Sequence, residues 1–109
     1  AFNRAVDRVI QWIETESSWD ETLLIVTTDH ANGLLLGPDS DTVFFQDPVA
    51  TGVGELPEAM WWSTNHTNEL VPLWSRGPGS ELFGTLVDGT DPRRGGFIDN
   101  TDVHTVMSR

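Results

Sequence analysis

Cysteine and lysine are both absent from this chain of 109 residues. Without cysteine, the chain forms no disulfide bond and offers no thiolate ligand to a metal. Without lysine, only 6 basic residues, all of them arginine, stand against 17 acidic residues, and the net charge is −11. Because phosphate backbones are bound by clusters of basic side chains, this charge argues against a nucleic-acid partner.

Long apolar segments and targeting signals are absent as well. No segment approaches the ~20 apolar residues of a membrane-spanning helix, so we expect no membrane span. The first residues lead directly into an amphipathic pattern, which is not the pattern of a signal peptide. The chain also lacks an initiator methionine, which is typical of a processed product or a fragment.

Two regular patterns open the chain. Apolar residues recur at helical spacing over residues 2–13, which predicts an amphipathic helix that ends near Ser17. The apolar run within residues 22–28 predicts a buried strand. A helix, a short loop and a buried strand form half of a βαβ unit, and a buried parallel strand needs a neighbour on each side. We therefore expect a central strand, with the helix packed on one face of its sheet.

The rest of the chain is less regular, with many glycine and proline turns. It predicts short strands at residues 43–45 and 59–62, an extended segment at 70–74, a turn at 76–79, a helical segment at 80–86 and a last helix capped by Asn100 or Thr101.

Asp29 and His30 end the apolar run of residues 22–28. In open α/β sheets, ligands bind beyond the carboxyl ends of the strands. A carboxylate beside an imidazole suits a divalent metal such as zinc. The alternative is a hydrogen-bonded histidine beside a helix-capping aspartate. His66 lies in a polar segment and is a further candidate ligand or an exposed loop residue, whereas His104 is expected on the surface.

Four segments, in order along nearly the whole chain, resemble the alkaline phosphatase family. Residues 27–33 (TTDHANG) and 65–73 (NHTNELVPL) resemble metal-binding segments of that superfamily. Residues 75–83 (SRGPGSELF) and 98–103 (IDNTDV) resemble segments of alkaline phosphatases themselves. The resemblance implies a three-layer α/β/α sandwich. Residues 1–109 would be the C-terminal part of a single catalytic domain.

The resemblance assigns roles to three residues. Asp29 and His30 would bind the zinc that activates a serine nucleophile, and His66 would bind the zinc that holds the leaving-group oxygen. Asn32 stands where some relatives carry an outer-sphere histidine, which would alter the tuning of zinc affinity. The activity implied is zinc-dependent hydrolysis of phosphate monoesters through a phosphoserine intermediate.

The resemblance assigns no residue of this chain to the other catalytic groups of such an enzyme. The nucleophilic serine, the phosphate-binding arginine, the magnesium ligands and the remaining zinc ligands are all expected upstream, so the chain alone is predicted to be inactive. Arg76, Arg93 and Arg94 are expected to be structural or surface residues. The resemblance further implies a periplasmic or secreted location and a homodimer.

Two other functions remain open at this stage. One is a metal-dependent, cofactor-independent phosphoglycerate mutase, a branch of the same superfamily with a similar Asp-His pair and a later histidine. The other is a noncatalytic fragment that binds a metal or a partner, with its five tryptophans forming an interaction surface in which Trp61 and Trp62 are the pair expected to be exposed. At least one of these two indoles should face a core.

Overall fold

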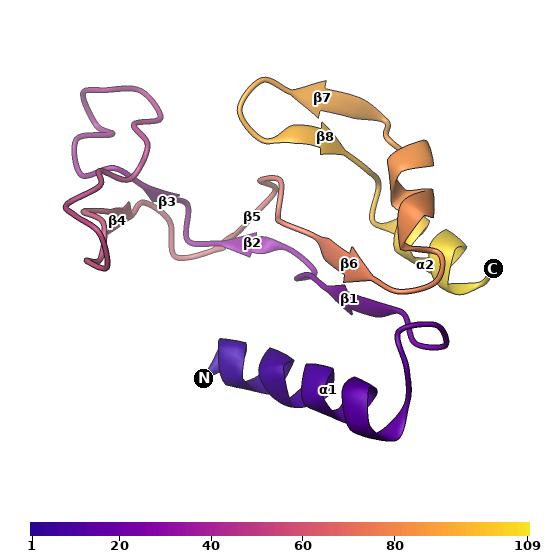
Figure 1. Cartoon of the computed structure of the whole chain (residues 1–109). Helices are drawn as coiled ribbons and strands as arrows, with labels where there is room; N and C mark the ends of the chain where they lie inside the picture. Colours follow the sequence, from indigo (N-terminus) through magenta and orange to yellow (C-terminus); the bar gives the residue numbers. More distant parts are fainter. The chain divides into compact units, whose positions relative to one another are not determined.

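The computed structural model describes residues 1–109 and divides into two compact units. The first unit comprises residues 1–29 and 72–109, and the second comprises residues 30–71. Along the chain, as labelled in Figure 1, the elements are α1 (Phe2–Glu16), β1 (Leu24–Val26), β2 (Ala31–Asn32), β3 (Leu35–Leu36), β4 (Met60–Trp61), β5 (His66–Thr67), β6 (Trp74–Arg76), the 3₁₀ helix η1 (Ser80–Thr85), β7 (Gly89–Asp91), β8 (Gly95–Phe97) and α2 (Thr101–Met107).

The first unit begins with the amphipathic helix that the sequence predicts. Helix α1 ends at Glu16, directly before the expected end at Ser17. Its apolar stripe is wider than the face that is covered: Ile13 is buried, whereas Phe2 and Trp12 are exposed. Neither α1 nor α2 is both long and apolar enough to cross a bilayer.

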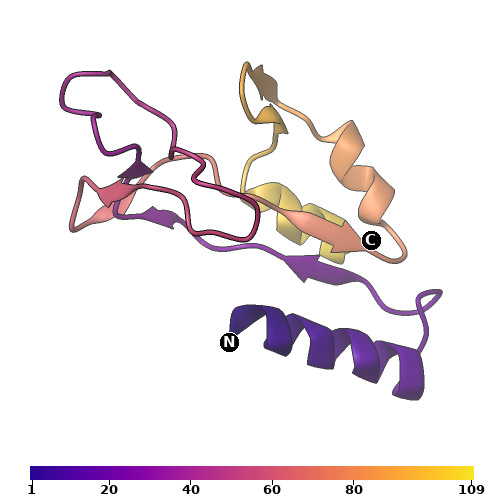
Figure 2. The ribbon, with the colours of Figure 1, turned by 60° about the vertical axis from the view of Figure 1, so that its left-hand side comes forward.

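Strand β1 forms where the apolar run predicts a strand, but its surroundings differ from the expectation. It pairs with β6 alone, in antiparallel register, with Leu24 opposite Arg76 and Val26 opposite Trp74. The two strands run side by side in both views (Figures 1 and 2). All three residues of β1 are only half-buried. The prediction of a buried, central, parallel strand is therefore wrong.

The expected three-layer α/β/α sandwich is also wrong. Each sheet of the structure contains two strands, and every pair is antiparallel. A three-layer sandwich needs a mostly parallel sheet covered by helices on both faces, and parallel neighbours need long crossover connections. Here no helix lies between two paired parallel strands, so the chain forms small hairpin sheets instead.

A small apolar core holds the C-terminal part of the first unit. Helix η1 packs against α2, and Phe83 and Val106 are buried between short elements of this region. Strands β7 and β8 form a hairpin beyond η1, with Gly89 opposite Phe97. The helical segments predicted from residue 80 and after Asn100 are confirmed, and Asn100 is the N-cap of α2. The side-chain hydrogen bonds at this end are accepted by Asp99, from the N–H and hydroxyl of Thr101.

The second unit is built from two short ladders and a turn. Strand β2 pairs with β5, and β3 pairs with β4. Residues 43–45, predicted as a strand, lie in the turn instead. The reason is local hydrogen bonding: Gly37 N–H donates to the Gln46 carbonyl at 2.7 Å, and Asp39 N–H donates to Gln46 Oε1 at 2.8 Å. These bonds close the turn and leave the aromatic ring of Phe44 86% exposed.

Candidate metal centre

The β2–β5 ladder brings two of the three histidines together in the second unit. His30 directly precedes β2, and His66 is the first residue of β5, opposite Asn32. Because side chains alternate between the two faces of a ladder, residues 30 and 32 share the face that carries His66. Antiparallel pairing of two-residue strands is thus sufficient to place both imidazoles on one surface.

The two imidazole rings are stacked on each other. Their centroids are 3.7 Å apart and the angle between the ring planes is 25°. His30 is half-buried and His66 is exposed, so the pair remains open to solvent on the His66 side. Because the ring planes are nearly parallel, the in-plane nitrogen lone pairs of each imidazole lie in a layer of their own.

Nδ1 of His30 contacts the backbone of the next residue. It lies 2.9 Å from the carbonyl oxygen of Ala31. Because a carbonyl oxygen can only accept, Nδ1 is the protonated nitrogen in this contact. A neutral His30 then carries its lone pair on Nε2, the nitrogen that would bind a metal. Backbone carbonyls commonly fix the tautomer of metal-binding histidines in this way.

Asp29 is the residue immediately before His30, and it belongs to the first unit. Its side chain is exposed, and Oδ1 accepts a hydrogen bond from Thr28 Oγ1 at 3.3 Å. The structure contains no group of three or more His, Asp or Glu side chains that could hold a metal ion. Of the three predicted ligands, the structure brings His30 and His66 together.

The other candidates occupy structural positions. His104 is exposed on α2, as expected, and contacts Ser108 on the same helix. The guanidinium carbon of Arg76 lies 3.9 Å from the ring centroid of Trp19, in a cation–π contact. The backbone N–H groups of Arg93 and Arg94 bind the carboxylate of Asp91 within the β7–β8 turn.

Two features of this site were not predicted from the sequence. The carbonyl of Ala31 has no sequence signal, since every residue carries one. In the sequence, Asn32 is only a departure from the family pattern, whereas in the structure it is the ladder partner of His66. Its position opposite a candidate ligand follows from the register alone.

Comparison of the chain with protein-family models, with curated proteins and with solved structures finds no match.

Proposed function

We propose that His30 and His66 each bind one of two neighbouring zinc ions in a centre that hydrolyses phosphate monoesters, to which this chain supplies part of the zinc ligands and not the nucleophile. The observation that carries this proposal is the stacked pair of imidazoles. Further support is the resemblance of residues 27–33 and 65–73 to the metal-binding segments of alkaline phosphatases. That resemblance adds Asp29 as a second ligand to the ion held by His30.

The spacing of the rings favours two ions over one. Two imidazoles on a single tetrahedral zinc diverge from the metal, and with Zn–N bonds of ~2.0–2.1 Å their ring centres are about 5 Å apart. The ring centres of His30 and His66 are only 3.7 Å apart and the planes are nearly parallel. Ions bound separately by such rings suit a two-metal centre, in which the metals are ~3.5–4 Å apart.

The donor set also fits zinc. The chain offers imidazole nitrogens and carboxylate oxygens, and both are ordinary zinc ligands. Two zinc ions supply charge stabilisation to the entering and leaving oxygens of an in-line phosphoryl displacement. The residues of this chain would hold and orient those ions: the contact of Nδ1 with the Ala31 carbonyl orients the His30 ring, and the β2–β5 ladder sets the position of His66.

The negative charge of the second unit should make phosphate binding at this site depend on bound metal ions. Residues 30–71 contain no arginine or lysine. The same residues contain six carboxylates: Asp39, Asp41, Asp47, Glu55, Glu58 and Glu69. A phosphate group would be repelled by this unit unless bound cations reverse the local charge. Phosphate binding by the second unit should therefore require zinc.

Zinc titration of the full chain by isothermal calorimetry tests the ligands. We expect binding that weakens at least tenfold in His30→Ala and in His66→Ala, and that weakens as the pH falls, because protons compete for the imidazoles. His104→Ala is the matched control and should bind zinc like the wild type. Equal losses in all three variants, or no zinc binding, would contradict the proposal.

Phosphate binding tests the chemistry beyond the metal. The ³¹P line of inorganic phosphate should broaden on addition of chain and zinc together, and not with either alone. We expect no turnover of an aryl phosphate by the zinc-loaded chain, because we assign no nucleophile to its residues. Zinc binding without an effect on phosphate would favour a noncatalytic metal-binding role, and hydrolysis well above contaminant controls would refute the predicted inactivity.

A further inference from the structure

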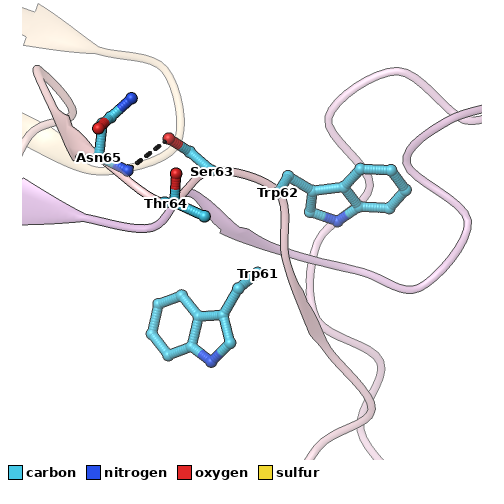
Figure 3. Close-up of a pocket in the computed structure, with 5 residues that line it drawn as sticks. All are labelled: Trp61, Trp62, Ser63, Thr64 and Asn65. Atoms are coloured by element: carbon cyan, nitrogen blue, oxygen red, sulfur yellow. Dashed lines mark hydrogen bonds between the residues drawn. The ribbon is translucent and has the colours of Figure 1, made fainter.

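We propose that Trp61 and the segment Ser63–Asn65 form a binding site for a neutral, planar heteroaromatic ring such as a nucleobase. These residues and Trp62 line an open hollow of about 420 Å³ in the second unit. Figure 3 shows the two indoles on opposite sides of the strand and the polar side chains beyond them.

The indole of Trp61 is held on one face and open on the other. An added Cβ at Gly33 would lie 2.5 Å from Cε3 of Trp61, so the ring packs directly on the glycine backbone. Gly33 also has a φ of +78°, which disfavours any larger residue. Trp61 is nevertheless 66% exposed. A large flat ring fixed on one side and free on the other is suited to stacking.

Trp62 has a different role beside it. Its indole Nε1 donates to the Gly37 carbonyl at 3.3 Å, and its backbone N–H donates to the Gly33 carbonyl at 3.0 Å. Trp62 therefore joins β4 to the Gly33–Gly37 segment, which supports the surface on which Trp61 rests. Trp62 is half-buried, whereas Trp61 is exposed.

The rim of the hollow is polar and carries no charge. Asn65 N–H donates to Ser63 Oγ at 3.0 Å, which orders the loop, while the Asn65 carboxamide and the Thr64 hydroxyl have no partner in the structure (Figure 3). A carboxamide both donates and accepts, as does the edge of a nucleobase. A sugar carries hydroxyl groups around its whole edge, and three short side chains would satisfy few of them.

Charge selects against anions at this position. The second unit has carboxylates and neither arginine nor lysine, so a ring bearing its own phosphate would be repelled in the absence of metal. A neutral ring, such as that of a nucleoside, avoids this penalty. The site therefore favours the neutral organic part of a ligand, and a phosphate on that ligand would have to be bound elsewhere.

The β2–β5 ladder places the stacking surface of Trp61, which we call the platform, next to the histidine pair. Trp61 packs on Gly33, and His66 pairs with Asn32, the preceding residue. We infer that the ring belongs to the alcohol part of a phosphate monoester, and this assignment alone rests on the proposed function. The stacking site itself requires no metal, so the two ideas can fail separately.

Adenosine titration of the metal-free full chain tests the site. Trp61 is one of five tryptophans, and its indole N–H signal is assigned in ¹H–¹⁵N spectra by its loss in Trp61→Phe. We expect adenosine to shift that signal, and Trp61→Ala to weaken binding about 5- to 150-fold, the range found when a stacking aromatic is removed. Trp61→Phe keeps a stacking ring and should bind within about threefold of the wild type.

The controls separate stacking from other causes. Trp12→Ala removes an exposed indole on α1 and should leave adenosine binding unchanged. His66→Ala should lose zinc binding and keep adenosine binding, and a loss of both would show that the ladder is disturbed and overturn the independence of the platform. Absence of an adenosine effect on Trp61, or stronger binding of maltose than of adenosine, would overturn the proposal.

Discussion

Gly77 provides the sharpest test of how β1 and β6 are held together. It follows β6 directly and has a φ of +114°. A Cβ built on it would overlap the carbonyl oxygen of Thr22, and would lie 2.9 Å from the Thr22 carbonyl carbon and 3.0 Å from the Leu23 Cα. These are backbone atoms, which cannot rotate away. Gly77→Ala must therefore separate the two chain segments.

The expected magnitude has two parts. A left-handed backbone costs an L-residue roughly 1–2 kcal/mol. Separating the segments adds about 1 kcal/mol for a weakened ladder hydrogen bond, and further packing is lost around the half-buried β1 residues. We expect a total of about 3 kcal/mol. Since small domains are stable by only ~5–15 kcal/mol, this is a large share of the free energy of unfolding.

Two other glycines of the first unit separate the cost of the left-handed backbone from the cost of moving the two segments apart. Gly95 has a φ of +85° and an added Cβ there would meet only open space, so Gly95→Ala should cost only the backbone part, ~1–2 kcal/mol. Gly84 lies in η1 with no neighbour within 4 Å and no positive φ, so Gly84→Ala should be within about 0.5 kcal/mol of the wild type. Urea unfolding followed by tryptophan fluorescence measures all three. If Gly77→Ala is no more destabilising than Gly95→Ala, the close approach of β6 to Thr22 is refuted.

Two further predictions concern charged side chains of the first unit. The backbone N–H groups of Arg94 and Arg93, at 2.7 and 2.9 Å, hold the pKa of Asp91 below its ordinary value of 3.8. A lowered folded-state pKa stabilises the fold above the unfolded pKa and loses this effect as the pH falls through the folded pKa. Asp91→Asn should therefore be destabilising at pH 7, with the difference from wild type shrinking below pH 3.8 in urea titrations; a pH-independent difference would contradict this. Arg76→Ala removes the cation–π contact with Trp19 and should cost about 0.5–1 kcal/mol, and a double-mutant cycle with Trp19→Ala that shows no coupling would exclude the contact.

Local signals in the sequence were sufficient for the helices and several turns. The spacing of apolar residues over positions 2–13 depends on neighbours three and four residues apart, and α1 forms there. The turn at residues 76–79 and the segments that become η1 and α2 are likewise set by nearby residues. Asn100 is the N-cap of α2, as its place before the helix predicts, while the neighbouring Asp99 accepts bonds of 2.9 and 2.6 Å from the Thr101 N–H and hydroxyl.

Local sequence signals did not predict the partner, direction or burial of each strand. The apolar run at residues 22–28 predicts a strand, but not which strand lies beside it or in which direction. The structure gives β1 a single antiparallel partner, β6, and β1 stays half-buried. The apolar residues 43–45 favour a strand by propensity, yet bonds from Gly37 and Asp39 to Gln46 bend them into a turn.

The candidate site shows the same division. The sequence identified Asp29, His30 and His66 by residue type and by the segments around them. Only the β2–β5 register brings His30 and His66 into a stack, and only the tertiary structure presents the Ala31 carbonyl to His30 and the Gly33 backbone to Trp61. Side-chain chemistry is a property of each residue alone. Proximity between distant residues depends instead on backbone hydrogen bonds between segments, which no local pattern specifies.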